Sequence, residues 1–171
     1  MIITVEELQT ISELSAISSD QLLVMSKGIE DFIRQYTNNN FTVRNINYNT
    51  PVIDGKLGTV SSAFKVDDTV LISNSLYNNG VYVISELDGT LNEELFDEDN
   101  VKVTLIKYPA SIKLGVIKLI QYDVRMNDKM GIASESISRH SVSYAQPSSD
   151  SIGGYPPNLM AFLKPYMKAR F

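Results

Sequence analysis

The chain has 171 residues, of which 43% are hydrophobic and 20% are charged, and this composition excludes a disordered, collagen-like or coiled-coil protein. The length allows one domain, or one domain that carries a sizeable insertion. The absence of cysteine excludes disulfides and thiolate chemistry, and the single histidine removes almost every histidine-based metal cluster.

The N-terminus, residues 1–7, contains no basic segment and no long apolar run, so we expect no signal peptide. No stretch of the chain approaches the roughly 20 apolar residues of a membrane span. The sequence therefore predicts a soluble protein that is made and used in a cytosol and has no membrane partner.

The net charge of -5 is distributed unevenly along the chain. Residues 1–100 hold 5 basic and 16 acidic side chains, a net of -11, whereas residues 101–171 hold 10 basic and 4 acidic ones, a net of +6. Opposite signs on the two halves favour directional contacts with another copy or with a partner. The alternative is that the two halves neutralise each other inside one fold.

Two helix signals open the chain. Thr4, with Glu7 three residues later, has the pattern of a capping box in front of a short helix. Ser18 precedes a longer apolar repeat at helical spacing, which predicts a helix over residues 19–36. Three consecutive asparagines at 38–40 end it.

From Phe41 the pattern changes to short alternating runs broken by turn residues, which is typical of β-strands. The turn dipeptides are Asp54-Gly55, Asn79-Gly80 and Asp88-Gly89. The strands predicted between them lie near residues 57–62, 68–73, 80–87 and 101–108. Antiparallel strands this short predict a small barrel or rolled sheet, which Pro109 closes.

Helical spacing returns after Pro109. We expect Ser111 to cap a helix in which Gly115 marks a close approach by another helix. The predicted apolar stripe of this helix consists of Leu114, Ile117, Ile120 and Val124.

The last part of the chain mixes strand, loop and helix signals. The run 136–144 alternates and predicts an exposed strand or hairpin arm. Residues 146–157 are rich in serine, glycine and proline and predict a loop, which a short helix over 158–164 follows.

Together these elements predict an α+β fold with a mainly α-helical core of about four helices and an inserted small antiparallel β-barrel or β-roll module. Residues 1–41 and 110–171 would form the helical core with a C-terminal docking tail. Residues 42–109 would form the inserted β module.

No motif in the chain indicates an enzyme. His140 is the first candidate for a general acid or base, but its neighbours form no recognised nucleophile arrangement, and a surface or interface histidine is the better interpretation. The acidic run 93–100 offers oxygen ligands without the spacing of a calcium loop. Gly153-Gly154 lacks the ending of a phosphate-binding loop. We therefore expect no catalytic residue, no cofactor and no metal.

Nucleic-acid binding would require clustered lysine and arginine, whereas this chain is acidic overall. Lys164, Lys168 and Arg170 cluster near the C-terminus beside Tyr166 and Phe171. Such an aromatic and basic tail suits a groove on a protein as well as a phosphate.

Several segments of the helical parts occur in a recognisable order. They read IEDFI (29–33), YTNN (36–39), LGVI (114–117), YD (122–123), SESISRHSVSY (134–144), GYP (154–156) and LMAFLKPYMKARF (159–171). In this order they resemble the head-tail connector family of long-tailed bacteriophages, also called head completion or neck adaptor proteins. The likeness covers nearly the whole chain apart from the β insertion, which the smallest family members lack.

The resemblance implies a structural virion protein without catalysis. Family members form a homo-oligomeric ring, about twelvefold in the virion, that docks beneath the portal protein after DNA packaging. The ring extends the DNA channel and offers a platform for the next neck or tail-completion protein. DNA would pass through without specific binding, and the protein would locate to the host cytoplasm during assembly and then to the neck of the virion.

In the family the C-terminal segment reaches toward the portal, which implies that residues 155–171 dock here. Large apolar groups on a terminal segment favour the same interpretation, because so many are not normally left in water. The alternative is that Leu159, Phe162 and Leu163 complete the core of the subunit itself. The predicted portal-docking residues are Tyr155, Phe162, Leu163, Lys164, Tyr166, Lys168, Arg170 and Phe171.

A second hypothesis treats the chain as a ligand- or carbohydrate-binding adhesion module that uses the β insertion. Tyr48, Tyr77 and Tyr82 would then stack against sugar rings. Tyrosines on strands are more often half-buried sheet residues, which weighs against this hypothesis.

Overall fold

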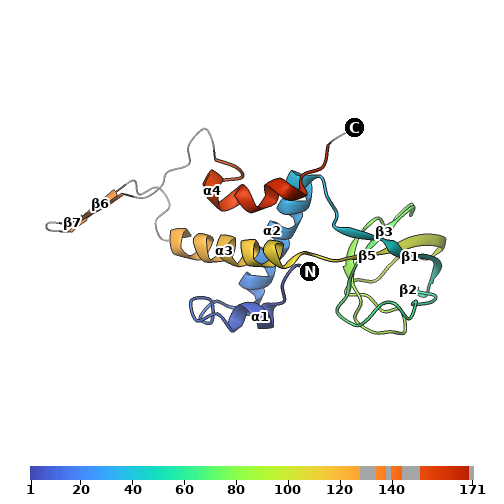
Figure 1. Cartoon of the computed structure of the whole chain (residues 1–171). Helices are drawn as coiled ribbons and strands as arrows, with labels where there is room; N and C mark the ends of the chain where they lie inside the picture. Colours follow the sequence, from blue (N-terminus) through green and yellow to red (C-terminus); the bar gives the residue numbers. More distant parts are fainter. Residues whose placement is uncertain (128–133, 138–139, 144–150, 170–171) are drawn as a thin grey trace. The chain divides into compact units, whose positions relative to one another are not determined.

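The computed structural model describes residues 1–127, 134–137, 140–143 and 151–169 (Figure 1). The chain forms two compact units. One, here called the β unit, consists of Asn39–Tyr108 together with Met1. The other, the helical unit, consists of Ile2–Asn38 and Pro109–Phe171.

The β unit is an open antiparallel half-barrel of five strands within the described residues (Figure 1). The strand order is β2-β1-β5-β3-β4, so β2 and β4 are the two edge strands of the described sheet and do not pair with each other. The strands are β1 (Thr42–Ile53), β2 (Lys56–Leu57), β3 (Thr69–Ser73), β4 (Gly80–Val83) and β5 (Glu98–Ile106).

Two turns set the register of this sheet. Asp54 and Gly55 both have positive φ, 52° and 74°, and form the two-residue turn between β1 and β2, in which Val52 pairs with Leu57. Gly89 also has a positive φ, 99°, and a Cβ atom there would lie 2.0 Å from the carbonyl oxygen of Leu57. Only glycine fits that position, because the backbone of β2 leaves no room for a side chain.

The inner face of the half-barrel carries a hydrophobic core of its own. Tyr48 packs edge-on against Phe64 with a centroid separation of 5.2 Å at the margin of this core. The buried members are Val52, Leu57, Phe64, Val70, Ile72, Ile84, Leu91, Leu95, Val101, Val103 and Leu105.

The helical unit is built around two long helices, α2 (Ser19–Thr37) and α3 (Ala110–Asn127). The shorter elements are α1 (Val5–Gln9), α4 (Pro157–Met160), the 3-10 helix η1 (Ala161–Tyr166) and the paired strands β6 (Ser134–Ile137) and β7 (His140–Ser143). The helix predicted over residues 19–36 is confirmed, and the side chain of Ser18 accepts a hydrogen bond from the backbone N–H of Gln21 at 3.3 Å.

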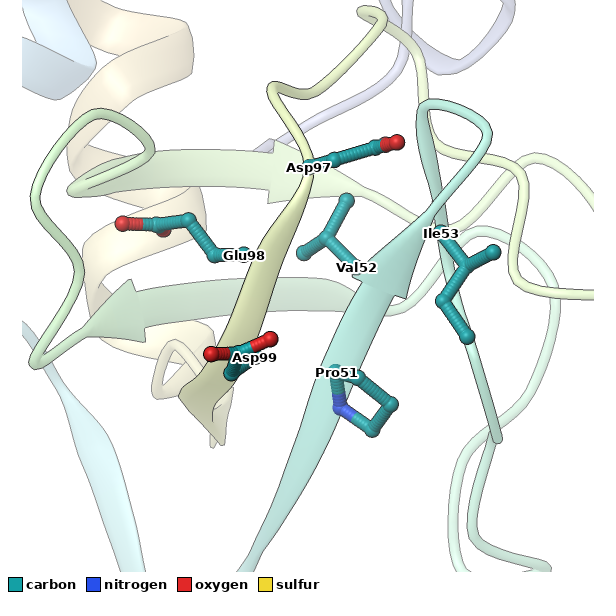
Figure 2. Close-up of a pocket in the computed structure, with 6 residues that line it drawn as sticks. All are labelled: Pro51, Val52, Ile53, Asp97, Glu98 and Asp99. Carbon is teal, nitrogen blue, oxygen red and sulfur yellow. The ribbon is translucent and has the colours of Figure 1, made fainter.

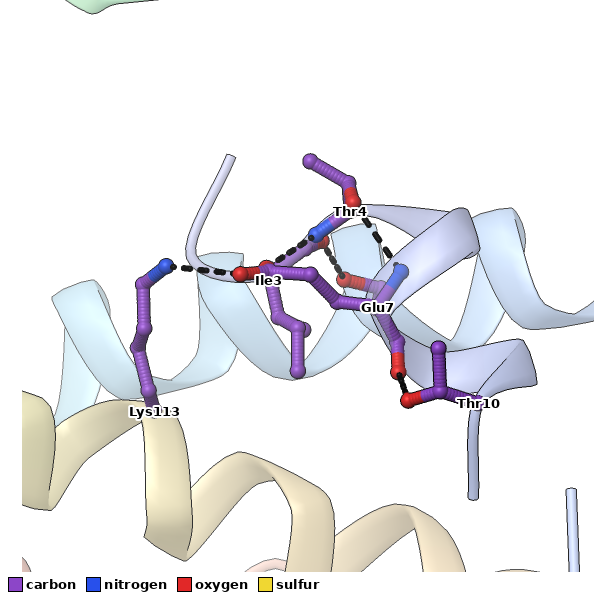
Figure 3. Close-up of polar contacts among 6 residues, drawn as sticks. Ile3, Thr4, Glu7, Thr10 and Lys113 are labelled. Carbon is purple, nitrogen blue, oxygen red and sulfur yellow. Dashed lines mark hydrogen bonds and ion pairs between the residues drawn. The ribbon is translucent and has the colours of Figure 1, made fainter. Parts of the chain in front are cut away.

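The capping box predicted at the N-terminus is confirmed (Figure 3). The Thr4 hydroxyl accepts the backbone N–H of Glu7 at 3.2 Å, and the Glu7 carboxylate accepts the backbone N–H of Thr4 at 3.1 Å. The second carboxylate oxygen of Glu7 lies 3.4 Å from the ammonium of Lys113 (Figure 3). The same side chain therefore caps α1 and ties it to α3.

The predicted mainly helical core with an inserted barrel or roll is wrong. A five-stranded half-barrel forms one of the two compact units, and of the described helices only α2 and α3 are longer than six residues. The sequence pattern missed the longest strand, β1, because asparagine and proline are depleted in strands and β1 contains three asparagines and Pro51. Pro51 is tolerated because the pairing with β5 shifts register there.

The predicted apolar stripe of α3 is wrong at Leu114, whereas Ile120 is buried as predicted and Ile117 and Val124 are half-buried. Leu114, predicted to be buried, is 53% exposed. The contact with Phe162 of η1 runs over Gly115, so the side of the helix that carries Gly115 faces inward and Leu114 faces outward. The buried face consists of Ile112, Gly115, Val116, Leu119 and Ile120.

The Gly89→Ala variant tests the close approach between the 86–90 loop and β2. We expect its free energy of unfolding to fall by more than the roughly 1–2 kcal/mol that a positive φ alone costs an alanine, because the new Cβ would collide with the Leu57 carbonyl. Gly55→Ala is the matched control, since its Cβ would meet only the flexible side chain of Glu94. Equal denaturation curves for both variants would contradict the described approach.

Candidate docking surface

The C-terminal segment begins with a tight turn at Gly153-Gly154. Both glycines have positive φ, 60° and 88°, and Ile152 and Tyr155 exchange two backbone hydrogen bonds of 3.0 Å across them. Two consecutive positive φ values define a two-residue hairpin turn, for which Gly-Gly is a preferred pair. This turn directs Tyr155 back onto the long helices.

Tyr155 anchors the segment to the helical unit. Its hydroxyl donates a 2.7 Å hydrogen bond to the carboxylate of Asp123 on α3. The centroid of its ring lies 6.3 Å from the ring centroid of Phe32 on α2 and 6.0 Å from that of Tyr122 on α3. Burial raises the pKa of Asp123, and burial together with the nearby carboxylate raises the pKa of Tyr155, so the tyrosine stays protonated and donates at neutral pH.

Beyond Tyr155 the chain packs directly on α3. Pro157 opens α4 at a position where its missing N–H is harmless. Met160 and Leu163 are fully buried, and the ring of Phe162 lies where a Cβ on Gly115 would be only 2.2 Å away. The expectation that Gly115 marks a close approach is confirmed, and the approaching group is an aromatic ring from η1.

The end of the segment is held by polar contacts. The hydroxyls of Tyr166 and Ser111 lie 2.6 Å apart, which joins η1 to the first turn of α3. The backbone N–H of Lys168 donates to the carbonyl of Thr37 at 2.8 Å, and the Asn38 amide donates to the carbonyl of Ala169 at 2.9 Å. The segment is therefore packed on α2 and α3 of its own chain as far as residue 169.

The structure places the predicted docking residues in three classes. Leu163 is buried in the core of the subunit, as the alternative interpretation requires for that residue. Lys164 and Lys168 are exposed, and docking by the segment stays a prediction. Tyr155, Phe162 and Tyr166 are half-buried against α2 and α3, whereas Arg170 and Phe171 lie outside the described residues.

The segment exposes basic and apolar side chains to solvent. Lys164, Met167 and Lys168, here called the tail surface, are exposed, and Met167 is 50% exposed. Leu114 and Lys118, here called the α3 face, are exposed on the neighbouring helix. The sequence reasoning missed Leu114, because it was assigned to the buried stripe, and Met167, which carried no signal.

The β unit contains a shallow pocket of about 340 Å³ (Figure 2). Its carboxylates do not converge, because Glu98 points away from Asp97 in Figure 2 and Asp97 accepts the backbone N–H of Gly55 at 3.0 Å. Among the described residues no three potential metal ligands gather in one place. The pocket is lined by Pro51, Val52 and Ile53 of β1 and by Asp97, Glu98 and Asp99.

The three tyrosines considered for sugar binding have different environments. Tyr48 and Tyr82 pack against the core of the β unit, and burial raises the pKa of both. Tyr77 is 69% exposed and lies beside Phe96 with a centroid separation of 6.0 Å. Carbohydrate binding by these residues stays a prediction, and only Tyr77 among them presents most of its ring to solvent.

No family model and no curated protein matches this chain.

Within the described part of the chain, no helix is both long and apolar enough to cross a bilayer. His140 stands opposite Ile137 in the pairing of β6 with β7, and its side chain lies outside the described part.

The Tyr155→Phe variant tests the anchor of the segment. Removing the hydroxyl leaves a half-buried carboxylate without that donor, so we expect the free energy of unfolding to fall by roughly 1–3 kcal/mol at pH 7. Because the pKa of Asp123 is raised, its carboxylate in the folded protein becomes protonated as the pH falls. Removing the Tyr155 hydroxyl costs less stability beside a neutral carboxyl group than beside a carboxylate. The difference from wild type should therefore be smaller at pH 4 than at pH 7.

Tyr36→Phe is the control for this experiment, because it removes a hydroxyl from another ring stacked near Phe32. Chemical denaturation followed by circular dichroism measures both variants. A Tyr155→Phe protein as stable as Tyr36→Phe at pH 7 would contradict an anchoring role for the bond.

Proposed function

We propose that this chain is a structural head-tail connector protein of a long-tailed bacteriophage, which forms an adaptor ring between the portal and the tail. The observation that carries the proposal is the state of the C-terminal segment. The part of the sequence that resembles the portal-docking segment of that family is folded against α2 and α3, and it leaves the tail surface exposed.

A preformed docking segment has a thermodynamic advantage over a flexible tail. Ordering a loose chain during binding consumes part of the interaction free energy, and a segment already fixed by Tyr155, Phe162 and Tyr166 avoids most of that loss. Lys164 and Lys168 can then pair with carboxylates on the portal, while Met167 fills an apolar depression.

The charge of the β unit fits a protein that lets DNA pass. Residues 39–108 hold 5 basic and 10 acidic side chains. This net negative charge repels DNA phosphates, so the unit does not bind DNA by displacing its counterions. In the proposed ring, DNA leaves through the channel without specific contacts, and the outer surface supports the next neck or tail-completion protein. The proposal requires no catalytic residue and no cofactor.

The Lys164→Glu/Lys168→Glu variant tests the proposal with purified portal protein encoded by the same phage genome. We expect binding to the portal to be lost and filled heads to leak DNA, because both charges that would meet portal carboxylates are reversed. The melting temperature should hardly change, since both side chains are exposed. Substitution is preferred to deletion, because a deletion would also remove the Tyr166 hydroxyl that contacts Ser111 on α3 and the Lys168 backbone N–H that donates to Thr37 on α2.

Lys27→Glu/Lys65→Glu is the matched control, with two exposed lysines reversed elsewhere on the chain. It should bind the portal like the wild type. Infectious particles with intact necks from the Lys164→Glu/Lys168→Glu variant would contradict docking through the tail surface.

A further inference from the structure

The chain contains one Asn-Gly pair, Asn79-Gly80, and it lies at the start of β4 in the β unit. Asparagine followed by glycine is the pair most prone to deamidation, because glycine has no side chain to shield its backbone nitrogen. That nitrogen can attack the side-chain carbonyl carbon of the preceding asparagine. Asn79 is exposed, so water has access to the reacting groups.

The backbone of Ser75 holds the side chain of Asn79. The side-chain carbonyl oxygen of Asn79 accepts the backbone N–H of Ser75 at 3.2 Å, and the side-chain amide nitrogen donates to the backbone carbonyl of Ser75. Deamidation expels this amide nitrogen as ammonia, so its bond to Ser75 must break first. The closed 75–79 loop therefore opposes the reaction.

The sheet holds the attacking nitrogen as well. The backbone N–H and C=O of Val83 bond with Asn92, so the backbone groups of Val83 face away from β3. Because these groups alternate in direction along a strand, those of Gly80 face toward β3, where Gly80 pairs with Ile72. The N–H of Gly80 is therefore directed at the sheet and away from the side chain of Asn79.

A hydrogen-bond network under the loop keeps this arrangement closed. The Glu98 carboxylate on β5 accepts from the backbone N–H of Leu76 at 2.6 Å, from the Asn78 amide at 2.9 Å and from the Ser75 hydroxyl. The bond from Ser75 does most to lower the pKa of Glu98, so the carboxylate stays ionised at neutral pH. The Asn78 amide, almost completely buried, also bonds with the backbone of Phe96.

We infer that Asn79-Gly80 is a latent deamidation site, which reacts only while the 75–79 loop is open. The Gly80 nitrogen forms a bond to the side-chain carbonyl carbon of Asn79, the bond from that carbon to the amide nitrogen breaks, and ammonia leaves with the proton of the Gly80 N–H. Water then opens the succinimide ring and leaves aspartate or isoaspartate at position 79. The overall reaction consumes one water and releases one ammonia.

The product does not restore the closed loop. A carboxylate at position 79 has no N–H to donate to the Ser75 carbonyl, and its negative charge repels that oxygen. Isoaspartate also adds a methylene to the backbone directly before β4, which disturbs the pairing of Gly80 with Ile72. Deamidation therefore loosens the loop that presents Leu76 and Tyr77, which are 83% and 69% exposed.

Mass spectrometry of the warmed full chain tests the inference at mildly alkaline pH, which favours loss of the Gly80 amide proton. We expect the native chain to deamidate at Asn79 about tenfold or more slowly than the same chain in guanidinium chloride, because its loop must open first. This comparison requires no variant. Equal rates in the two states, or no reaction in the denatured chain, would overturn the inference.

The Glu98→Ala variant tests whether opening of the loop controls the rate. Removing the acceptor for Ser75, Leu76 and Asn78 should bring the native rate severalfold closer to the denatured rate. Asp99→Ala is the matched control, since it removes the next carboxylate along β5. Circular dichroism checks that both variants are folded. A Glu98→Ala protein that is folded and deamidates no faster than Asp99→Ala would count against control by the loop.

Limited digestion with chymotrypsin tests the effect on the loop. The Asn79→Asp variant carries the product carboxylate from the start, so we expect severalfold faster cleavage after Leu76 or Tyr77 than in the wild type. Asn49→Asp is the matched control, because it makes the same charge change at an exposed residue of β1. Equal cleavage of the two variants would contradict the loosening. The reaction involves the β unit alone, so these results are independent of the proposed function.

Discussion

The hydrogen bond between Tyr155 and Asp123 determines how the helical unit ends. It lies at the point where the Gly153-Gly154 turn brings the chain back onto α2 and α3, and the contacts that follow depend on that return. Phe162 reaches Gly115 and Tyr166 reaches Ser111 only if the segment enters at this place and in this direction. Together with the burial of Met160 and Leu163, the bond makes the C-terminal segment part of the subunit instead of a loose extension.

This packing gives neighbouring residues of one short segment two different roles, burial in the core and exposure to solvent. Leu163 and Met160 stabilise the subunit from inside, whereas Lys164, Met167 and Lys168 remain available outside. A helical or 3-10 segment necessarily alternates in this way, because successive side chains point to different sides. Docking in the proposed function thus uses the outer side of an element whose inner side is already committed to the core.

The sequence predicts the helical elements better than the sheet. Ser18 and the capping box of Thr4 with Glu7 are local signals, and local hydrogen bonds decide those helix starts. The strand β1 escaped prediction because its partners in β5 lie about fifty residues away, and long-range pairing overrides the low strand preference of its asparagines. The prediction of a small barrel or rolled sheet could not specify an open half-barrel, because strand length and the pairing of edge strands depend on residues far apart in the chain.

The candidate surface was predicted in part. The C-terminal segment was identified from its apolar and basic residues, but the sequence could not tell that Leu163 points inward, because both interpretations need apolar residues there. Leu114 was missed because the buried face of α3 is decided by its packing against α2, α4 and η1, which lie far from it in the sequence. The exposure of Leu76 and Tyr77 was not predicted, because they precede the hairpin signal at Asn79-Gly80. The hydrogen bonds of Asn78 with Phe96 and Glu98 fix that loop, and they join residues about twenty positions apart in the sequence.

The central claim is tested most directly by cryo-electron microscopy of particles from the phage that encodes this chain. The proposed function predicts a closed ring of this protein beneath the portal, with the tail surface against the portal, and its location anywhere else in the particle, or its absence from it, would contradict the claim.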